Sequence, residues 1–217
     1  MRFLALGIFA VIWGMNSYFR NCKNCGLSFF HNDFNPIDFF CKKCWFELEK
    51  YKTPTQFKIY KSPEVLVRPL FLWDEKESEV GNLIHGLKGG TPFEIIRKLS
   101  LEIIARESPA QDAIIVPVPS SKVGEKDHAY QIANIISEEL GLRLWCGLRW
   151  ENKSTNQKFL KKTERFVSTM TKTERLPPTR QVILIDDLVT TGATATAAYK
   201  AIKSLNQIEV WALACRI

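Results

Sequence analysis

The residues best suited to do chemistry lie at positions 182–194, where two carboxylates precede a turn of small hydroxyl side chains. Residues 182–185 are apolar and rich in β-branching, which predicts a buried strand. Asp186 and Asp187 follow it directly, and residues 190–194 (Thr-Thr-Gly-Ala-Thr) lead into a helical pattern at residues 195–205. Carboxylates accept hydrogen bonds from vicinal ribose hydroxyls, and a turn at the positive end of a helix presents N–H groups to phosphate. This order predicts a sugar-phosphate site; the alternative is an ordinary strand-to-helix turn whose threonines cap the helix.

A second candidate site is formed by four of the six cysteines. Cys22 and Cys25 form one pair, Cys41 and Cys44 form another, and fifteen residues separate the pairs. This spacing is typical of a closed tetrahedral thiolate site, so we predict a structural zinc ion. Two disulfides, which need an oxidising compartment, or a redox pair are the alternatives. We expect the other two cysteines, at positions 146 and 215, to be core residues.

The elements that must position these residues alternate between strand and helix patterns. We expect strands at residues 113–118, 142–148, 182–185 and 208–216, and helices at residues 47–51, 77–87, 92–106, 127–140 and 195–205. A further strand pattern at residues 65–73 contains Pro69, which predicts an edge or a bulge. The alternation predicts an α/β fold, a mostly parallel sheet with helices on both faces. Ligands of such sheets bind at the carboxyl ends of the strands, where the acid pair and residues 117–122 both fall.

Composition places the chain among ordinary globular proteins, with 217 residues, 46% of them hydrophobic and 24% charged. Its net charge of +7 is concentrated in residues 152–180, which hold eight Lys or Arg and two Glu. A localised basic stretch indicates an anionic partner, either pyrophosphate or nucleic acid, with a solvated surface loop as the alternative.

The first residues of the chain form an apolar segment. Residues 3–19 contain no charged side chain, a length of roughly 26 Å as a helix and the lower limit for a membrane span. Three interpretations of residues 1–20 stay open: an apolar helix docked on the protein or on a membrane face, a membrane anchor, or translation that starts at Met15. We expect a cytoplasmic protein, with membrane association through this segment as the open alternative.

Taken together, these motifs resemble the ComF family, whose members are phosphoribosyltransferase-like and some of which are tied to DNA uptake in natural transformation. The resemblance rests on the fingerprint at residues 182–194 and on the four-cysteine segment. It rests also on Leu87-Lys88-Gly89-Gly90, Val116-Pro117-Val118-Pro119, Arg149, Gln157, Leu160, Arg165, Ala214 and Arg216. The chain departs from the family at residues 127–131, where Asp-His-Ala-Tyr-Gln stands in place of Arg-Gly-Phe-Asn-Gln.

The resemblance implies a type I phosphoribosyltransferase fold at residues 60–217, preceded by the apolar segment 1–20 and a zinc module at residues 21–52. It also implies a site for phosphoribosyl pyrophosphate. The implied ligand-binding residues are Asp186, Asp187, Thr190, Thr191, Gly192, Ala193 and Thr194, with Ser120, Ser121 and Lys122 at the place of the pyrophosphate loop. Mg²⁺ would be carried mainly by the ligand's own oxygens. Residues 152–171 take the place of the mobile lid.

Two functions follow as hypotheses. The first is binding of phosphoribosyl pyrophosphate or a related ribose 5-phosphate, with transfer of the phosphoribosyl group to an acceptor that the sequence does not identify; whether turnover occurs stays open. The second is a single-stranded-DNA-binding protein of competence that reuses the fold without turnover, grips DNA through residues 152–180 and associates with the membrane or the uptake machinery.

Overall fold

The computed structural model describes residues 19–22, 25, 28–30, 40–54, 57–62, 65–73, 80–81, 93–120, 128–151, 169–202 and 207–217. The chain divides into two compact units. One comprises residues 1–52 with 75–90, and the other comprises residues 53–74 with 91–217. The interpretations of residues 1–18, of the helix at residues 77–87 except Val80 and Gly81, and of residues 152–168 lie outside the described residues.

The first unit contains a small hairpin and a short helix. Strands β1 (Phe19–Asn21) and β2 (Ser28–Phe30) pair antiparallel. Helix α2 (Lys42–Glu49) begins directly after Cys41, earlier than the predicted residues 47–51, and buries Cys44, Trp45 and Leu48. The helix thus contains one cysteine of the second pair and is preceded by the other, so the metal-ligand spacing and the helical turn coincide.

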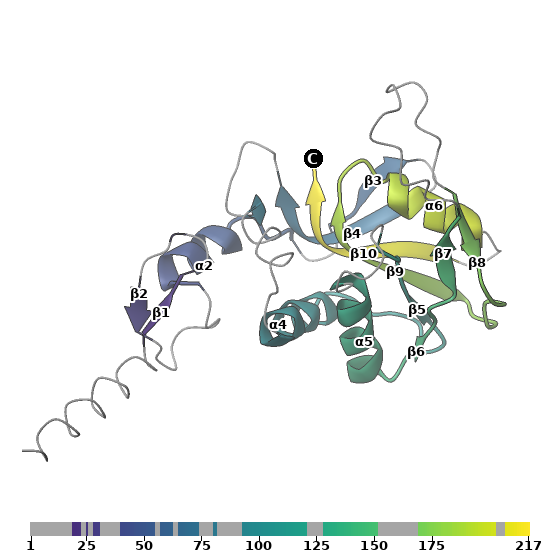
Figure 1. Ribbon diagram of the computed structural model, residues 1–217, viewed down its shortest axis with the longest axis horizontal. Coiled ribbons are helices and arrows are strands. Elements are labelled where there is room, and N and C mark those ends of the chain that lie inside the picture. Colours follow the sequence, from purple (N-terminus) through teal and green to yellow (C-terminus); the bar gives the residue numbers. More distant parts are fainter. Residues whose placement is uncertain are drawn as a thin grey trace, which may run out of the picture. The chain divides into compact units, whose positions relative to one another are not determined.

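The second unit is built on a six-stranded sheet in the order β3-β4-β10-β9-β5-β6 (Figure 1). Its strands are β3 (Ile59–Ser62), β4 (Val65–Trp73), β10 (Gln207–Arg216), β9 (Gln181–Val189), β5 (Ile114–Pro117) and β6 (Arg143–Leu144). Only the β3–β4 pair of this sheet is antiparallel. The last strand of the chain is central, and its residues from Val210 to Cys215 are buried.

Helices cover both faces of this sheet. Helices α4 (Phe93–Ile104) and α5 (His128–Leu140) pack together on one face, and α6 (Ala193–Ile202) lies on the other (Figure 1). Under α6, Ala195 and Ala198 belong to one buried cluster with Val182 and Leu184 of β9, where small side chains let the helix approach the strands closely. This architecture confirms the predicted α/β fold class with a mostly parallel sheet.

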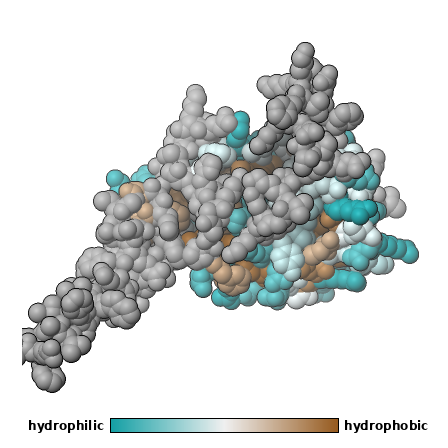
Figure 2. All heavy atoms as spheres, in the orientation of Figure 1, coloured by the Kyte–Doolittle hydropathy of each residue, from teal (hydrophilic) through white to brown (hydrophobic). Residues whose placement is uncertain are grey.

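The surface of this unit differs along its length. On the face drawn in Figure 2, apolar residues gather over α4 and hydrophilic residues cover the end that carries the hairpin of β7 (Leu148–Trp150) and β8 (Met170–Lys172). Among the described residues, none of the helices has the length and apolar character needed to cross a membrane.

Strand β4 corrects the prediction made from Pro69. The strand is continuous and lies between β3 and β10, with Pro69 opposite Ala212. Proline is tolerated because β3 pairs only with residues 65–67, so no ladder partner there needs the N–H that Pro69 lacks. Thr53 covers this side instead: its hydroxyl donates to the Pro69 carbonyl at 2.6 Å, and its N–H donates to the Leu70 carbonyl at 3.0 Å.

Away from the carboxyl ends of the strands, a buried charge cluster joins the segment after α4 to the sheet. The Arg68 guanidinium contacts both oxygens of Glu209, at 2.6 Å from Nε and 2.9 Å from Nη2, and also bonds the Glu107 carboxylate. Burial raises the pKa of Glu107 despite the neighbouring Arg68. Removing the guanidinium would leave two buried carboxylates without their cation, so this cluster fixes the register of β4 against β10.

One cysteine prediction is wrong. Cys215 is fully buried in β10, as expected, but Cys146 is exposed because it lies in the connection between β6 and β7 rather than inside a strand. The predicted strand at residues 142–148 is in fact two short strands, and the break between them turns the Cys146 side chain toward solvent.

Candidate functional site

The acid pair lies inside β9, near its carboxyl end, and β9 is a central strand of the sheet. The prediction of a strand that ends at residue 185, directly before the acid pair, is wrong, because the parallel pairing with β10 continues to Val189. Asp186 stands opposite Ala212 of β10, and its predecessor Ile185 pairs with Pro117 of β5. The Ile185 carbonyl accepts a hydrogen bond from the Val118 N–H at 2.9 Å, which extends the pairing past the end of β5. Parallel pairing therefore places the turn after β5 beside the acid pair, at the edge where ligands of such sheets bind.

The two carboxylates have different environments. Asp186 is buried, with 8% of the residue exposed, whereas 26% of the Asp187 side chain is exposed. Burial, and then the charge of Asp187 and a hydrogen bond shared with it, raise the pKa of Asp186 well above its usual range. The raised pKa favours the neutral form of the Asp186 carboxyl, which can donate a hydrogen bond, while the oxygens of Asp187 can accept one. A pair of this kind can both donate to and accept from the hydroxyls of a sugar.

The threonine turn begins α6 and is fixed by local hydrogen bonds. The Ala193 N–H donates to Thr191 Oγ1 at 3.3 Å, and the Thr196 N–H donates to the Gly192 carbonyl at 2.8 Å. The first is the capping contact of the alternative interpretation, so the turn has a structural role whatever it binds. Thr190 and Thr194 are half-buried, while Thr191 and Ala193 are exposed.

Glycine is required at position 192 for two reasons. Its φ of 76° lies in the left-handed region, which side chains with a Cβ rarely adopt. A Cβ built there would also lie 2.9 Å from the Cβ of Lys61 in β3, which cannot swing away as the end of a side chain could. The turn thus passes close to the backbone of another strand at the start of α6.

Of the predicted pyrophosphate-loop residues, Ser120 is described and half-buried, and Ser121 and Lys122 lie outside the described residues. The segment before them is anchored by Trp150, whose indole Nε1–H donates to the Pro119 carbonyl at 2.9 Å. Trp150 ends β7, and after it the Glu151 N–H donates to the Thr169 carbonyl at 2.9 Å. The residues on either side of segment 152–168, Glu151 and Thr169, are therefore held together, and Trp150, just before Glu151, contacts the turn after β5.

His128 is a site residue that the sequence did not reveal. It is the first residue of α5, and its Nδ1 lies 3.9 Å from Oδ2 of Asp187. The departure from the family pattern at residues 127–131 is the one feature of the sequence that could have drawn attention to it, and it does not by itself indicate a contact with Asp187. The imidazole is mostly buried, with 11% of its side chain exposed.

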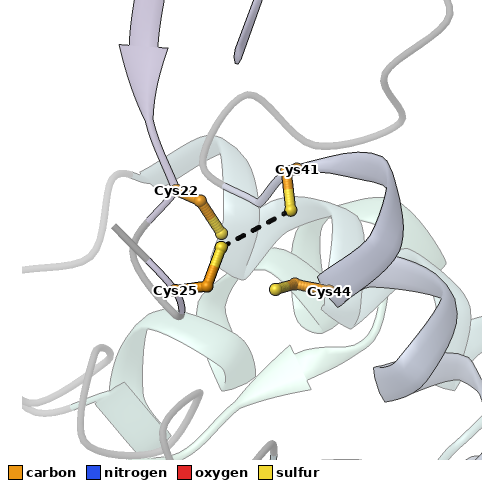
Figure 3. A group of neighbouring side chains, drawn as sticks. All are labelled: Cys22, Cys25, Cys41 and Cys44. Atoms are coloured by element: carbon orange, nitrogen blue, oxygen red, sulfur yellow. Dashed lines mark hydrogen bonds between the residues drawn. The ribbon is translucent and has the colours of Figure 1, made fainter. Parts of the chain in front are cut away.

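The four cysteines converge on one point (Figure 3). Their sulfur atoms all lie within 4.8 Å of one another, and Cys25 Sγ is 3.7 Å from Cys41 Sγ. That distance is far longer than the about 2.05 Å of a disulfide. It matches the about 3.8 Å edge of a tetrahedron whose metal–sulfur bonds are about 2.3 Å. The residues brought together from the β1–β2 hairpin and α2 can hold a metal ion.

Comparison with known proteins finds likenesses among solved structures. The chain is similar to orotate phosphoribosyltransferase from Aeropyrum pernix at 20% identity and a TM-score of 0.34, over 56% of this chain and 57% of that chain. It is similar to adenine phosphoribosyltransferase from Leishmania tarentolae at 15% identity and a TM-score of 0.43, over 73% and 94%. It is similar to glutamine phosphoribosylpyrophosphate amidotransferase from B. subtilis at 17% identity and a TM-score of 0.37, over 54% of this chain and 26% of that chain.

The chain spans little more than half the length of the first of these proteins and about a quarter of the amidotransferase. No protein-family model and no curated protein sequence matches it. We therefore base the functional proposal on the chain's own residues and their geometry.

Proposed function

We propose that this protein binds phosphoribosyl pyrophosphate, or a related ribose 5-phosphate, at the carboxyl edge of its sheet. The observation that carries the proposal is the acid pair near the end of β9, followed after two further strand residues by a tight threonine-glycine turn at the N-terminus of α6. Asp186 and Asp187 hold the vicinal ribose hydroxyls. The turn of residues 190–194 holds the 5′-phosphate through hydroxyls and N–H groups at the positive end of the helix.

In this proposal the turn after β5 binds the pyrophosphate of the ligand. Ser120 follows the segment that pairs with β9 and so lies at the same edge of the sheet, and Ser121 and Lys122 come next in the sequence. Five Lys or Arg stand in the sequence between Glu151 and Thr169, directly after Trp150, whose indole bonds the Pro119 carbonyl of this turn. Mg²⁺ supplies charge neutralisation on the pyrophosphate when it is bound, and Asp187 is the more exposed carboxylate available to it.

Transfer of the phosphoribosyl group is the reaction that such a site supports. An acceptor nucleophile forms a bond to C1 of the ribose while the bond to pyrophosphate breaks, and the electron pair leaves with pyrophosphate. The chain's residues contribute by orienting the ribose and by binding the departing anion, without a protein nucleophile. The acceptor is the open part of this proposal.

A thermal-shift titration of the full chain with phosphoribosyl pyrophosphate and Mg²⁺ tests the proposal. The ligand should raise the melting temperature, and replacing Asp186 and Asp187 together by Asn should abolish the rise. The matched control is Glu138→Gln with Glu139→Gln, an adjacent acid pair exposed on α5, which should keep the rise intact. A wild-type protein whose melting temperature does not change at saturating ligand would overturn the proposal.

We propose zinc as the metal of the four-cysteine cluster. Four thiolates at tetrahedral spacing leave no position for substrate, which favours a structural ion over a catalytic one. Metal analysis of the purified protein should give one zinc per chain. The disulfide alternative predicts instead that no zinc is bound and that the four cysteines resist alkylation unless a reductant is added.

Single-stranded-DNA binding in competence is the second candidate function. It is supported by the resemblance to ComF and by the eight basic residues of positions 152–180, of which Arg180 has a side chain 90% exposed. Filter binding of labelled single-stranded DNA across a salt series tests it. Affinity that rises steeply as salt falls supports this function, and its absence at low salt removes it. Association with a membrane or with uptake machinery through residues 1–20 is tested by fractionating chains that begin at Met1 and at Met15.

A further inference from the structure

The carboxyl edge contains one imidazole, His128, that faces the acid pair and that the proposed function does not use. His128 Nδ1 lies 3.9 Å from Oδ2 of Asp187. This separation is within ion-pair reach but longer than a hydrogen bond, so the contact can tighten when a ligand fixes the carboxylate. Both side chains are partly sheltered, with 11% of the His128 side chain and 26% of the Asp187 side chain exposed.

His128 is set in place by its position in the fold. It opens α5, and the residues that follow it, Ala129, Ile132 and Ala133, are buried under the sheet. The helix is therefore fixed against β5 and β9, and its first residue is carried to the carboxyl edge beside the acid pair. A side chain attached to a packed helix provides a more rigid contact than one on a loop.

The imidazole of His128 can restrict how the carboxylate of Asp187 is oriented. An imidazole N–H aimed at one oxygen of Asp187 restricts rotation of that carboxylate. The other oxygen is then held in one orientation toward the space in front of the strand ends. Asp186, buried one residue earlier in the strand, cannot turn to replace it.

We propose that His128 is a positioning residue that orients Asp187 for recognition of vicinal hydroxyls, and so makes the site selective for a ribose phosphate over phosphate alone. This inference rests on the proposed function of the same site. In this proposal the threonine turn of residues 190–194 binds the phosphate, and Asp187, oriented by His128, recognises the sugar.

The test compares two ligands on the full chain at one neutral pH, ribose 5-phosphate and inorganic phosphate, by calorimetry or ligand-observed NMR. His128→Ala should weaken ribose 5-phosphate about tenfold, the loss expected for one hydrogen bond to a charged group. Its affinity for inorganic phosphate should stay within about twofold of wild type, because the turn is untouched. His128→Asn, whose amide nitrogen lies near the position of Nδ1, should restore most of the lost affinity.

The control on the same helix is Asn134→Ala. It removes the exposed hydrogen bond from Asn134 Nδ2 to Glu138 Oε1, at 2.7 Å, and should change neither affinity. Melting temperatures of the unliganded variants separate positioning from folding, since a purely structural His128 would lower stability and weaken both ligands alike.

The outcomes distinguish this inference from the function beneath it. If wild type binds neither ribose 5-phosphate nor phosphoribosyl pyrophosphate, the proposed function fails and the inference with it. Suppose instead that wild type binds ribose 5-phosphate. If His128→Ala binds it equally well, or if its affinity for inorganic phosphate falls as much as its affinity for ribose 5-phosphate, the function stands and the role of His128 is overturned.

Discussion

The four-cysteine cluster and the carboxyl edge of the sheet are assembled over very different distances in the sequence. The cysteines lie within 23 consecutive residues and come from a hairpin and the helix that follows it. The edge gathers residues from β5, α5, β9 and α6, which span positions 117–194. The first site is specified by local spacing, and the second exists only when the parallel sheet has formed.

This difference predicts where each region is vulnerable. The described part of the first unit has few large buried side chains, so a bound metal must supply much of its folding free energy. The edge is supported by a sheet whose central strands are almost wholly buried. Changes there should affect what the edge binds more than whether the sheet folds.

Metal removal is expected to have the largest effect. A chelator, or Cys22→Ser with Cys41→Ser, should unfold the first unit, because structural zinc contributes on the order of 10 kcal/mol to folding in small modules. Hydrogen exchange should show loss of protection at residues 40–52 with β9 and β10 still protected. The matched control is Cys146→Ser, an exposed cysteine outside the cluster, which should leave exchange unchanged. Simultaneous loss of protection in both units would show that they are not separable in this way.

Replacing the glycine of the turn comes next. Gly192→Ala places a Cβ where φ is 76° and where Lys61 Cβ would be 2.9 Å away, so it should cost about 1–2 kcal/mol and displace the turn. The rise in melting temperature caused by phosphoribosyl pyrophosphate should disappear. Thermal-shift titration measures both effects.

The control for this change is Gly141→Ala. Gly141 has φ 64° at the end of α5, but nothing lies within 4 Å of its added Cβ. Gly141→Ala should lower the free energy of unfolding by a similar amount, because its φ is also positive, but phosphoribosyl pyrophosphate should still raise the melting temperature. If both alanine variants respond to the ligand alike, the turn is not the phosphate site.

Much of this arrangement was predictable because two signals are strong in the sequence. Cysteine spacing identified all four members of the cluster, and the apolar run before Asp186 identified the buried strand β9, although the strand continues past the acid pair to Val189. Periodicity identified α4 and α5 to within two residues at each end. Each of these depends on residues close together in the chain.

What could not be predicted depends on contacts between distant segments. Pro69 indicated an interruption, but β3 pairs with β4 only at residues 65–67, and Thr53 forms hydrogen bonds to β4 beyond them. His128 carries no local pattern, and its approach to Asp187 follows from the packing of α5 on the sheet. The hydrogen bond from the Trp150 indole to the Pro119 carbonyl likewise joins segments 31 residues apart.

The third test is the pH dependence of the free energy of unfolding, which shows whether the buried carboxyl of Asp186 destabilises the folded chain at neutral pH. The pKa of Asp186 is raised by burial and then by Asp187, whereas an unfolded Asp titrates at about 3.9. The folded chain therefore binds this proton more tightly, and the free energy of unfolding falls as pH rises from about 4 through the raised pKa. Asp186→Asn has no such proton to lose.

Asp186→Asn should therefore be more stable than wild type at neutral pH. A gain on the order of 1 kcal/mol corresponds to about 2–4 °C in melting temperature, and it should shrink toward zero near pH ~4. Thermal melts across this pH range provide the measurement. A variant less stable than wild type at every pH would mean that the carboxyl of Asp186 is needed for folding rather than held ready for a ligand.

The smallest expected effect concerns the contact that joins the β7–β8 hairpin to the edge. Trp150→Phe keeps an aromatic ring but removes the indole N–H that donates to the Pro119 carbonyl at 2.9 Å, a loss of about 1 kcal/mol. Because that carbonyl precedes Ser120, affinity for phosphoribosyl pyrophosphate should fall a few-fold, by about the factor this energy gives. Trp145→Phe is the matched control: its indole Nε1 has no hydrogen-bond partner among the described residues, so it should lower stability through packing alone and leave affinity unchanged. Equal loss of affinity in both variants would show that general packing around the hairpin, rather than this hydrogen bond, supports the edge.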